Sequence, residues 1–234
     1  MNLERAELVL GDAVMKRLRA ARVILFGVGG VGGWCAEALV RSGLGNITVV
    51  DPDIVAEHNV NRQVMALSST VGRPKVEVLR ERLLDINPEA TVCALQKAWD
   101  RDYGDTFGLD GYDYIVDAID SLKDKINLIA LGSRSSARMF SSMGAACKVD
   151  PTRVRIAEFW EVRGCPLGSA LRKKMRQTKV TTEHPVTCVY SDELIPNKWK
   201  EGDEERPNGS LVTVTAAFGL TIASLIIQDV MNHE

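Results

Sequence analysis

The feature that most constrains the fold is a glycine-rich turn that directly follows a short apolar run. The run RVILF leads into GVGGVGGW, which places Gly27, Gly29 and Gly32 in the pattern G-x-G-x-x-G. An apolar run of this length indicates a buried strand, and the glycines allow a tight turn into a helix whose N-terminus faces a phosphate. The sequence therefore predicts a strand–turn–helix unit that binds a phosphate compound.

Strand and helix signals alternate along most of the chain. The expected strands are residues 22–27, 46–51, 90–96, 112–120, 138–146 and 152–162. The expected helices, from the helical spacing of apolar residues, are 3–20, 32–43, 74–88, 123–135 and 211–230. This alternation predicts the α/β class, with a doubly wound, mostly parallel sheet of the Rossmann-like type and extra elements in the C-terminal part.

The composition is that of a globular protein without a strong charge bias. The chain has 234 residues and a formal net charge of −2, so a nucleic-acid partner would need a local basic patch. The five cysteines include no C-x-x-C pair, which predicts reduced thiols and no four-cysteine zinc site. The N-terminal segment is too charged for the apolar core of a secretory signal, and we expect a cytoplasmic protein.

One apolar segment near the C-terminus needs a separate interpretation. The run LVTVTAAFGLTIASLII, residues 211–227, reaches the lower length limit for a membrane span. Threonine and serine side chains interrupt it, and a covered central helix of an α/β protein has the same pattern. We therefore expect a buried helix, with peripheral membrane contact as the alternative.

Polar residues beyond the glycine turn favour ATP chemistry over dinucleotide binding. Asp51 lies 19 residues after Gly32, where a carboxylate can bind the ribose of NAD or of ATP. An enzyme that cleaves ATP between its α- and β-phosphates must also hold the departing pyrophosphate, and Arg62 and Lys75 suit that task. Asp120 ends another expected strand and suits Mg²⁺, which prefers oxygen ligands.

Five motifs in a fixed order carry a family resemblance. They are GVGGVG, VVDPD, NVNRQ, GRPKVEVLRERLLDINP and VDAIDS. Together they resemble the superfamily of ThiF, MoeB and ubiquitin-activating enzymes, which adenylate carboxylates with ATP. The resemblance implies a single adenylating domain over residues 1–234, with an ATP-binding core at 1–150 and a C-terminal extension at 151–234. In that extension we expect a basic segment at 163–179, a mobile loop at 192–209 and the apolar helix at 211–230.

The resemblance also implies roles for residues at matching positions. The phosphates would be faced by Gly27, Gly29, Gly30 and Gly32. The ribose and polyphosphate would be bound by Asp51, Asp53, Asn59, Arg62, Gln63 and Lys75, and Asp120 would hold Mg²⁺. Arg5 matches an arginine that reaches into the ATP site of a neighbouring subunit, which implies a homodimer. The direct catalytic set would be Arg5, Arg62, Lys75 and Asp120.

Ordinary structural roles are the alternatives for these residues. The three cations Arg5, Arg62 and Lys75 would then be solvated surface charges. Asp51 and Asp53 would form a turn around the intervening proline, and Asp120 would cap the following helix.

The C-terminal part narrows the resemblance to one branch. The C-x-x-C pairs of many ThiF and MoeB relatives are absent, whereas GCPLGSALRKKMRQ, VTCVYSDE and NGSLVTVTAAFGLTIASLIIQDV resemble the tRNA threonylcarbamoyladenosine dehydratases. In that branch ATP activates the threonine carboxylate of a modified adenosine beside the anticodon. An internal nitrogen then expels AMP and closes a hydantoin. The resemblance implies ATP and Mg²⁺ as cofactors without zinc, tRNA as substrate, and sulfur-mobilising proteins as candidate partners.

A basic segment would supply the positive charge that tRNA requires. Its cations are Arg163, Arg172, Lys173, Lys174, Arg176 and Lys179. Cations at this density without interleaved aromatic residues predict contact with the RNA backbone rather than base reading. A solvated helix face is the alternative. Cys165 and Cys188 are candidate nucleophiles, but the sequence offers no base for either thiol.

Three other functions stay open on these residues. The chain could adenylate the C-terminal glycine of a ubiquitin-like sulfur-carrier protein, although the missing C-x-x-C pairs argue against it. It could be an NAD-dependent oxidoreductase, or an ATP-binding scaffold without catalysis.

Overall fold

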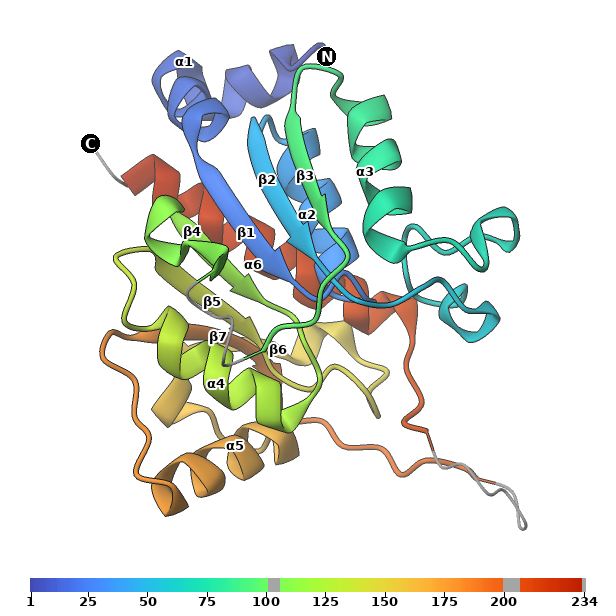
Figure 1. The fold of residues 1–234 in the computed structure, drawn as a ribbon, viewed down its shortest axis with the longest axis vertical. Coiled ribbons are helices and arrows are strands. Elements are labelled where there is room, and N and C mark those ends of the chain that lie inside the picture. Colours follow the sequence, from blue (N-terminus) through green and yellow to red (C-terminus); the bar gives the residue numbers. More distant parts are fainter. Residues whose placement is uncertain (101–105, 200–206, 233–234) are drawn as a thin grey trace.

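A seven-stranded sheet forms the centre of the protein, which the computed structural model describes over residues 1–100, 106–199 and 207–232. The strand order is β3-β2-β1-β4-β5-β7-β6 (Figure 1). The strands are β1 Arg22–Phe26, β2 Asn46–Val50, β3 Thr91–Leu95, β4 Tyr114–Asp117, β5 Arg138–Ser142, β6 Val154–Glu158 and β7 Val186–Ser191. Neighbouring strands are parallel, except that β6 is antiparallel to β7. The predicted α/β class with a doubly wound, mostly parallel sheet is confirmed.

Helices cover both faces of the sheet (Figure 1). They are α1 Glu4–Ala20, α2 Gly32–Arg41, α3 Lys75–Ile86, α4 Leu122–Gly132, α5 Pro166–Gln177 and α6 Val212–Asn232. The helices α2, α3 and α6 enclose one core with the sheet, and α1 contacts α6. The helices α4 and α5 enclose a second core on the other face.

Alternate residues of the central strands supply these two cores. In β1, Val23 and Leu25 belong to the core under α2, whereas Ile24 and Phe26 belong to the core under α4. Because both faces are covered, both sets of side chains are apolar. This burial on both sides explains why RVILF has no polar alternation.

The N-terminal helix departs from the expected regular helix at Gly11. This residue has φ 75° and ψ 158°, which is not a helical conformation, so α1 consists of two helical pieces. Glycine tolerates a positive φ because it has no Cβ. Leu8 and Val9, just before the break, are strongly exposed.

The C-terminal strands differ most from the expectation. Residues 186–191 were not expected to form a strand, yet β7 lies between β5 and β6 and pairs with both. Its sequence VTCVYS mixes hydroxyl and apolar side chains without the continuous apolar run of the other central strands. The expected strands 112–120 and 138–146 end earlier, at Asp117 and Ser142.

The apolar C-terminal helix packs closely against the first helix of the glycine-turn unit. By length and composition α6 could cross a membrane, and half of its most apolar window is buried. Phe218, Ile222 and Ile226 are fully buried in the core shared with α2. A Cβ on Gly219 would lie 2.4 Å from the Val31 carbonyl oxygen, so only glycine permits this approach.

Replacing this glycine is expected to destabilise the fold. Gly219→Ala forces α6 away from α2 and should lower the free energy of unfolding by about 1–3 kcal/mol. The matched control is Gly111→Ala, where no atom lies within 4 Å of the added Cβ, and it should stay within about 0.5 kcal/mol of the parent. Urea unfolding measures both. Equal stability of the two variants would contradict the close packing.

Candidate functional site

The predicted site residues gather where parallel strands end. Phe26 at the end of β1 is paired with Val50 of β2 and Asp117 of β4. Gly27 and Asp51 directly follow two of these strands, and the Asp120 segment follows the third. Ligands of open α/β sheets bind outside the carboxyl ends of the strands.

The glycine turn lies in direct contact with the chain that follows β4. Gly27 has φ 86°, and a Cβ there would lie 2.7 Å from the Ala118 carbonyl oxygen. A Cβ on Gly32 would lie 1.9 Å from the Gly27 carbonyl oxygen. The turn therefore cannot carry side chains at these two positions, and in the part of the chain that the structure describes no side chain caps the N-terminus of α2. An uncapped helix N-terminus attracts phosphate through its N–H groups and its dipole.

Asp51 ties the glycine turn to its own loop. One carboxylate oxygen accepts a hydrogen bond from the Val28 N–H at 2.8 Å, and the other accepts from the Asp53 N–H at 2.9 Å. Burial raises the pKa of Asp51, and the nearby Lys75 and both backbone donors oppose that shift. Asp51 therefore stabilises its own loop, as expected for a turn residue, and also lies beside the glycine turn.

Lys75 is not a solvated surface charge. Its side chain is buried at the first position of α3, and its Nζ lies 2.7 Å from Asp53 Oδ2. The Asp53 side chain is itself mostly exposed. The charge of Lys75 also acts on Asp51, where it lowers the pKa against the rise caused by burial.

The NVNRQ loop covers the glycine turn with Arg62 and Gln63. Arg62 Cγ lies 3.3 Å from an ideal Cβ at Gly30, and Arg62 Nη1 donates to the His58 carbonyl at 2.8 Å. The buried Gln63 Nε2 lies 3.7 Å from an ideal Cβ at Gly29, and Gln63 Oε1 has no hydrogen-bond partner among the described residues. A buried amide oxygen without a donor fits a group that becomes satisfied when a ligand binds.

Asn59 has a structural role within the same loop. Its side-chain oxygen accepts a hydrogen bond from the Ala56 N–H at 3.1 Å, and the residue is buried. This bond closes the short turn Glu57–Asn59 that precedes Arg62. The Asn59 side chain therefore stabilises the loop that carries Arg62 and Gln63.

Asp120 is exposed in the segment between β4 and α4. The cap of α4 is the next residue, because Ser121 Oγ accepts a hydrogen bond from the Asp124 N–H. The alternative role of Asp120 as the helix cap is therefore not observed. Its carboxylate is accessible to a hydrated cation.

A fully buried ion pair, with one residue on each side of Asp120 in the sequence, was not predicted. Lys125 Nζ lies 2.8 Å from Asp117 Oδ2, and both side chains are 0% exposed. Ser141 Oγ donates to the same carboxylate oxygen at 2.6 Å. Burial raises the pKa of Asp117, and Lys125 opposes that shift most strongly. The motif VDAID contained the signal, because Asp117 lies on an otherwise apolar strand.

Arg5 does not join the site within its own chain. It is exposed in the first turn of α1, and α1 leads into the amino end of β1. Figure 1 shows α1 at the amino edge of the sheet, away from the carboxyl ends.

Most of the basic segment forms α5, with Arg163 before the helix and Lys179 after it, and its cations do not share one environment. Lys173, Lys174 and Lys179 are exposed. Arg172 is buried and donates to the Phe159 carbonyl at 3.2 Å, so the expectation that it contacts RNA is corrected. Burial lowers the pKa of Arg172, helped by repulsion from neighbouring arginines. Arg176 lies over the ring of Trp160 at 5.5 Å.

The two candidate cysteine nucleophiles are buried. Burial raises the pKa of the Cys188 thiol far above its usual value, which opposes thiolate formation. Cys165 Sγ accepts a hydrogen bond from the Gly168 N–H and caps α5. Both thiols therefore have the environment of structural cysteines.

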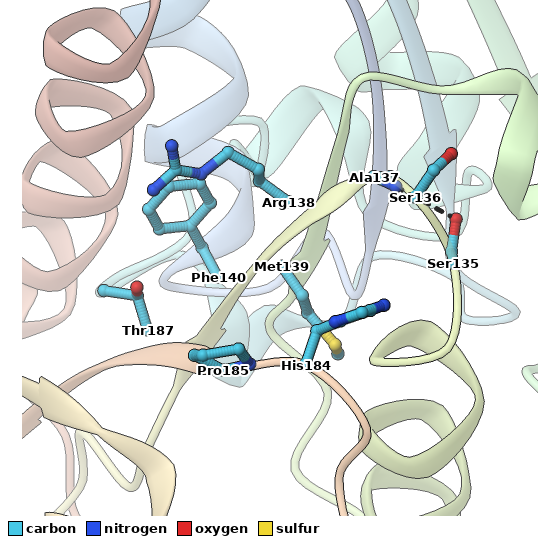
Figure 2. A pocket seen from close by; sticks show the side chains of 9 residues that line it. All are labelled: Ser135, Ser136, Ala137, Arg138, Met139, Phe140, His184, Pro185 and Thr187. Atoms are coloured by element: carbon cyan, nitrogen blue, oxygen red, sulfur yellow. Dashed lines mark hydrogen bonds between the residues drawn. The ribbon is translucent and has the colours of Figure 1, made fainter. Parts of the chain in front are cut away.

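A separate cavity lies at the opposite edge of the sheet. Its volume is about 330 Å³, and Figure 2 shows its lining side chains, which include Ser135, Arg138 and His184. These residues precede or begin β5 and β7, so the cavity faces the amino ends of the strands. It does not overlap the residues around the glycine turn.

Known proteins resemble the chain over nearly its whole length. A Bacillus subtilis (strain 168) protein named tRNA threonylcarbamoyladenosine dehydratase is 42% identical, with 97% of this chain and 94% of that protein covered. Structures of the E. coli tRNA N6-threonylcarbamoyladenosine dehydratase TcdA in complex with AMP and with ATP superpose with TM-scores of 0.89 and 0.88. Each is 32% identical and covers 98% of this chain and 93% of that chain. The ThiF family matches residues 3–234. The chain therefore belongs to the ThiF family.

Proposed function

We propose that the protein is an ATP-dependent tRNA threonylcarbamoyladenosine dehydratase. The observation that carries the proposal is the similarity over 98% of the chain to TcdA, a dehydratase whose structure has been solved in complex with ATP. The glycine turn, Asp51 and Lys75 form the matching local chemistry. The expected location is the cytoplasm.

The proposed reaction has two steps that balance. A carboxylate oxygen of the threonine group attacks the α-phosphorus of ATP, the bond to the β-phosphate oxygen breaks, and pyrophosphate leaves. The carbamoyl nitrogen then attacks the activated carbonyl carbon, loses its proton and expels AMP with the former carboxylate oxygen. The ring is a hydantoin, and the tRNA has lost one water. The second step is intramolecular, so its high effective molarity removes the need for a covalent enzyme intermediate.

The residues around the glycine turn divide the work of binding ATP. The backbone of Gly27, Gly29, Gly30 and Gly32 would approach the phosphates. Asp51 would bind the ribose, and Lys75 with Arg62 would attract the pyrophosphate as its charge develops. The Gln63 side chain lies beside Gly29, and its unpartnered oxygen would accept a donor from the bound substrate.

The exposed carboxylate of Asp120 fits Mg²⁺, because hard divalent cations prefer carboxylate and water oxygens. The ion would neutralise charge on the phosphates when bound. Asp53, which pairs with Lys75, would hold that ammonium in place until ATP binds. We further propose that Arg5 acts from a second copy of the chain, since it cannot reach its own site from α1.

The exposed face of α5, together with Lys179 just beyond its C-terminal end, would anchor tRNA. Lys173, Lys174 and Lys179 are free of the burial that removes Arg172 from this surface. Lysine contacts of this kind attach to phosphates and add affinity without reading sequence.

The function is tested by incubating the protein with bulk tRNA and Mg-ATP and measuring nucleosides by mass. The expected result is loss of one water from threonylcarbamoyladenosine together with stoichiometric AMP. Pyrophosphate exchange that requires a small carrier protein and ignores tRNA would support the sulfur-carrier alternative instead. Binding of NADH without ATP affinity would support an oxidoreductase.

Asp120→Ala is expected to abolish turnover without unfolding the protein. The carboxylate is exposed and contributes little packing, so the urea midpoint should stay close to the parent. The rate of AMP formation should fall by about 10²-fold or more, the range for loss of one group that stabilises developing charge. Full activity, or loss of the fold, would contradict the assignment.

Neutralising α5 is expected to weaken tRNA binding in a salt-dependent way. The triple change Lys173→Gln, Lys174→Gln and Lys179→Gln should reduce the slope of log affinity against log salt by up to about 2 to 3, because each lost phosphate contact removes about 0.7 to 0.9. The control carries the same charge change on exposed residues of other elements, Lys16→Gln, Arg80→Gln and Arg134→Gln. Equal slopes for both triple variants would contradict the proposal that these lysines contact tRNA.

A further inference from the structure

The buried pair Asp117–Lys125 does more than neutralise itself. Lys125 Nζ also donates to the Ile119 carbonyl at 3.0 Å. The second oxygen of Asp117 accepts from the Ile119 N–H at 3.2 Å. Both backbone polar groups of Ile119 are therefore held by one charged pair, and Ile119 immediately precedes Asp120.

The same short segment lies against the glycine turn. The atoms nearest to an ideal Cβ at Gly27 are Ala118 O, Ala118 C and Ile119 N, all within 2.9 Å. Residues 118–120 are thus fixed on one side by the glycine turn and on the other by the ion pair. The Ser121 cap then fixes the start of α4, which carries Lys125.

A charged pair in the core carries a desolvation cost that an apolar pair does not. Burying two ions costs several kcal/mol each, and apolar residues of similar volume are often as stabilising. The pair is fully buried, and its hydrogen bonds are made to Ser141 and to the backbone beside Asp120. Residues that lock the geometry of a functional side chain contribute to the reaction rate rather than to stability.

The geometry points to Asp117 and Lys125 as positioning residues for adenylation, which orient the Ile119–Asp120 peptide and with it the Asp120 carboxylate. This inference rests on the proposed function of Asp120. Among the described residues, the side chains of Asp117 and Lys125 bond to each other, to Ser141 and to the Ile119 backbone, so the pair acts through the backbone of residues 118–120. Ser141 donates its hydrogen bond to the Asp117 carboxylate and not to the backbone of Ile119, so we expect its loss to have a smaller effect.

The test compares three variants of this chain with a matched control. Lys125→Met removes the charge, and the double change Asp117→Asn with Lys125→Met leaves a neutral pair that is less costly to bury. Ser141→Ala keeps the clamp on Ile119. The control is Glu37→Gln, a buried carboxylate that pairs with Arg41 and Arg82 on α2 and α3.

The measurements are tRNA-dependent AMP formation, its KM for ATP, its Mg²⁺ dependence and urea unfolding, at a temperature where each variant is folded. For both Lys125 variants we expect kcat to fall about 30-fold or more with KM for ATP within about 3-fold, because positioning acts on the transition state. The half-saturating Mg²⁺ concentration should rise. For Ser141→Ala and Glu37→Gln, kcat should stay within about 3-fold of the parent value, even if the variant is less stable.

Unchanged kcat in a folded Lys125 variant would overturn the inference, as would an equal loss in Glu37→Gln at matched stability. If neither Lys125 variant folds, hydrogen exchange of the parent protein decides, since a clamped Ile119 amide must exchange as slowly as the core strands. Asp120→Asn is measured in parallel. Retained activity in Asp120→Asn would contradict the proposed role of Asp120. Loss of activity in Asp120→Asn, together with unchanged activity in the Lys125 variants, would contradict only the positioning role of the ion pair.

Discussion

The close approach of two backbones underlies the whole site. The glycine turn after β1 lies on the chain after β4 with no space for a side chain at Gly27, and the turn closes on itself with none at Gly32. This contact brings the N-terminus of α2, the carboxylate of Asp51 and the Asp120 segment to one edge of the sheet. Each other feature of the site depends on it, because the charged residues come from loops that are held against this turn.

Local sequence patterns predicted the N-terminal half of the sheet well, for a physical reason. The glycine turn, the buried parallel strands and the helix after Pro74 are each encoded by residues that are adjacent in the chain. Burial on both faces makes these strands continuous apolar runs, which are easy to recognise. The positions of Gly27, Asp51 and Lys75 at one edge follow from the topology of such a sheet.

Other features depend on partners that are distant in sequence. Arg172 has the spacing of an exposed helix cation, but Phe159 receives its guanidinium in the interior. Lys125 stands in a helix whose polar residues resemble surface positions, and only the fold brings Asp117 and Ser141 to it. Strand β7 was missed because its pairing with β5 and β6 stabilises a sequence without a clear strand pattern.

The placement of the last elements has a consequence for the order in which the protein can be completed. Among the described strands, β6 pairs with β7 alone. Because β7 follows some 30 residues later in the chain, β5 keeps an open edge until β7 is synthesised. Helix α6, the final helix, closes the core over α2. A growing chain that already contains the glycine turn and α2 therefore still lacks α6, which packs against α2. The edge of the sheet at the glycine turn therefore becomes complete only after α6 has been synthesised.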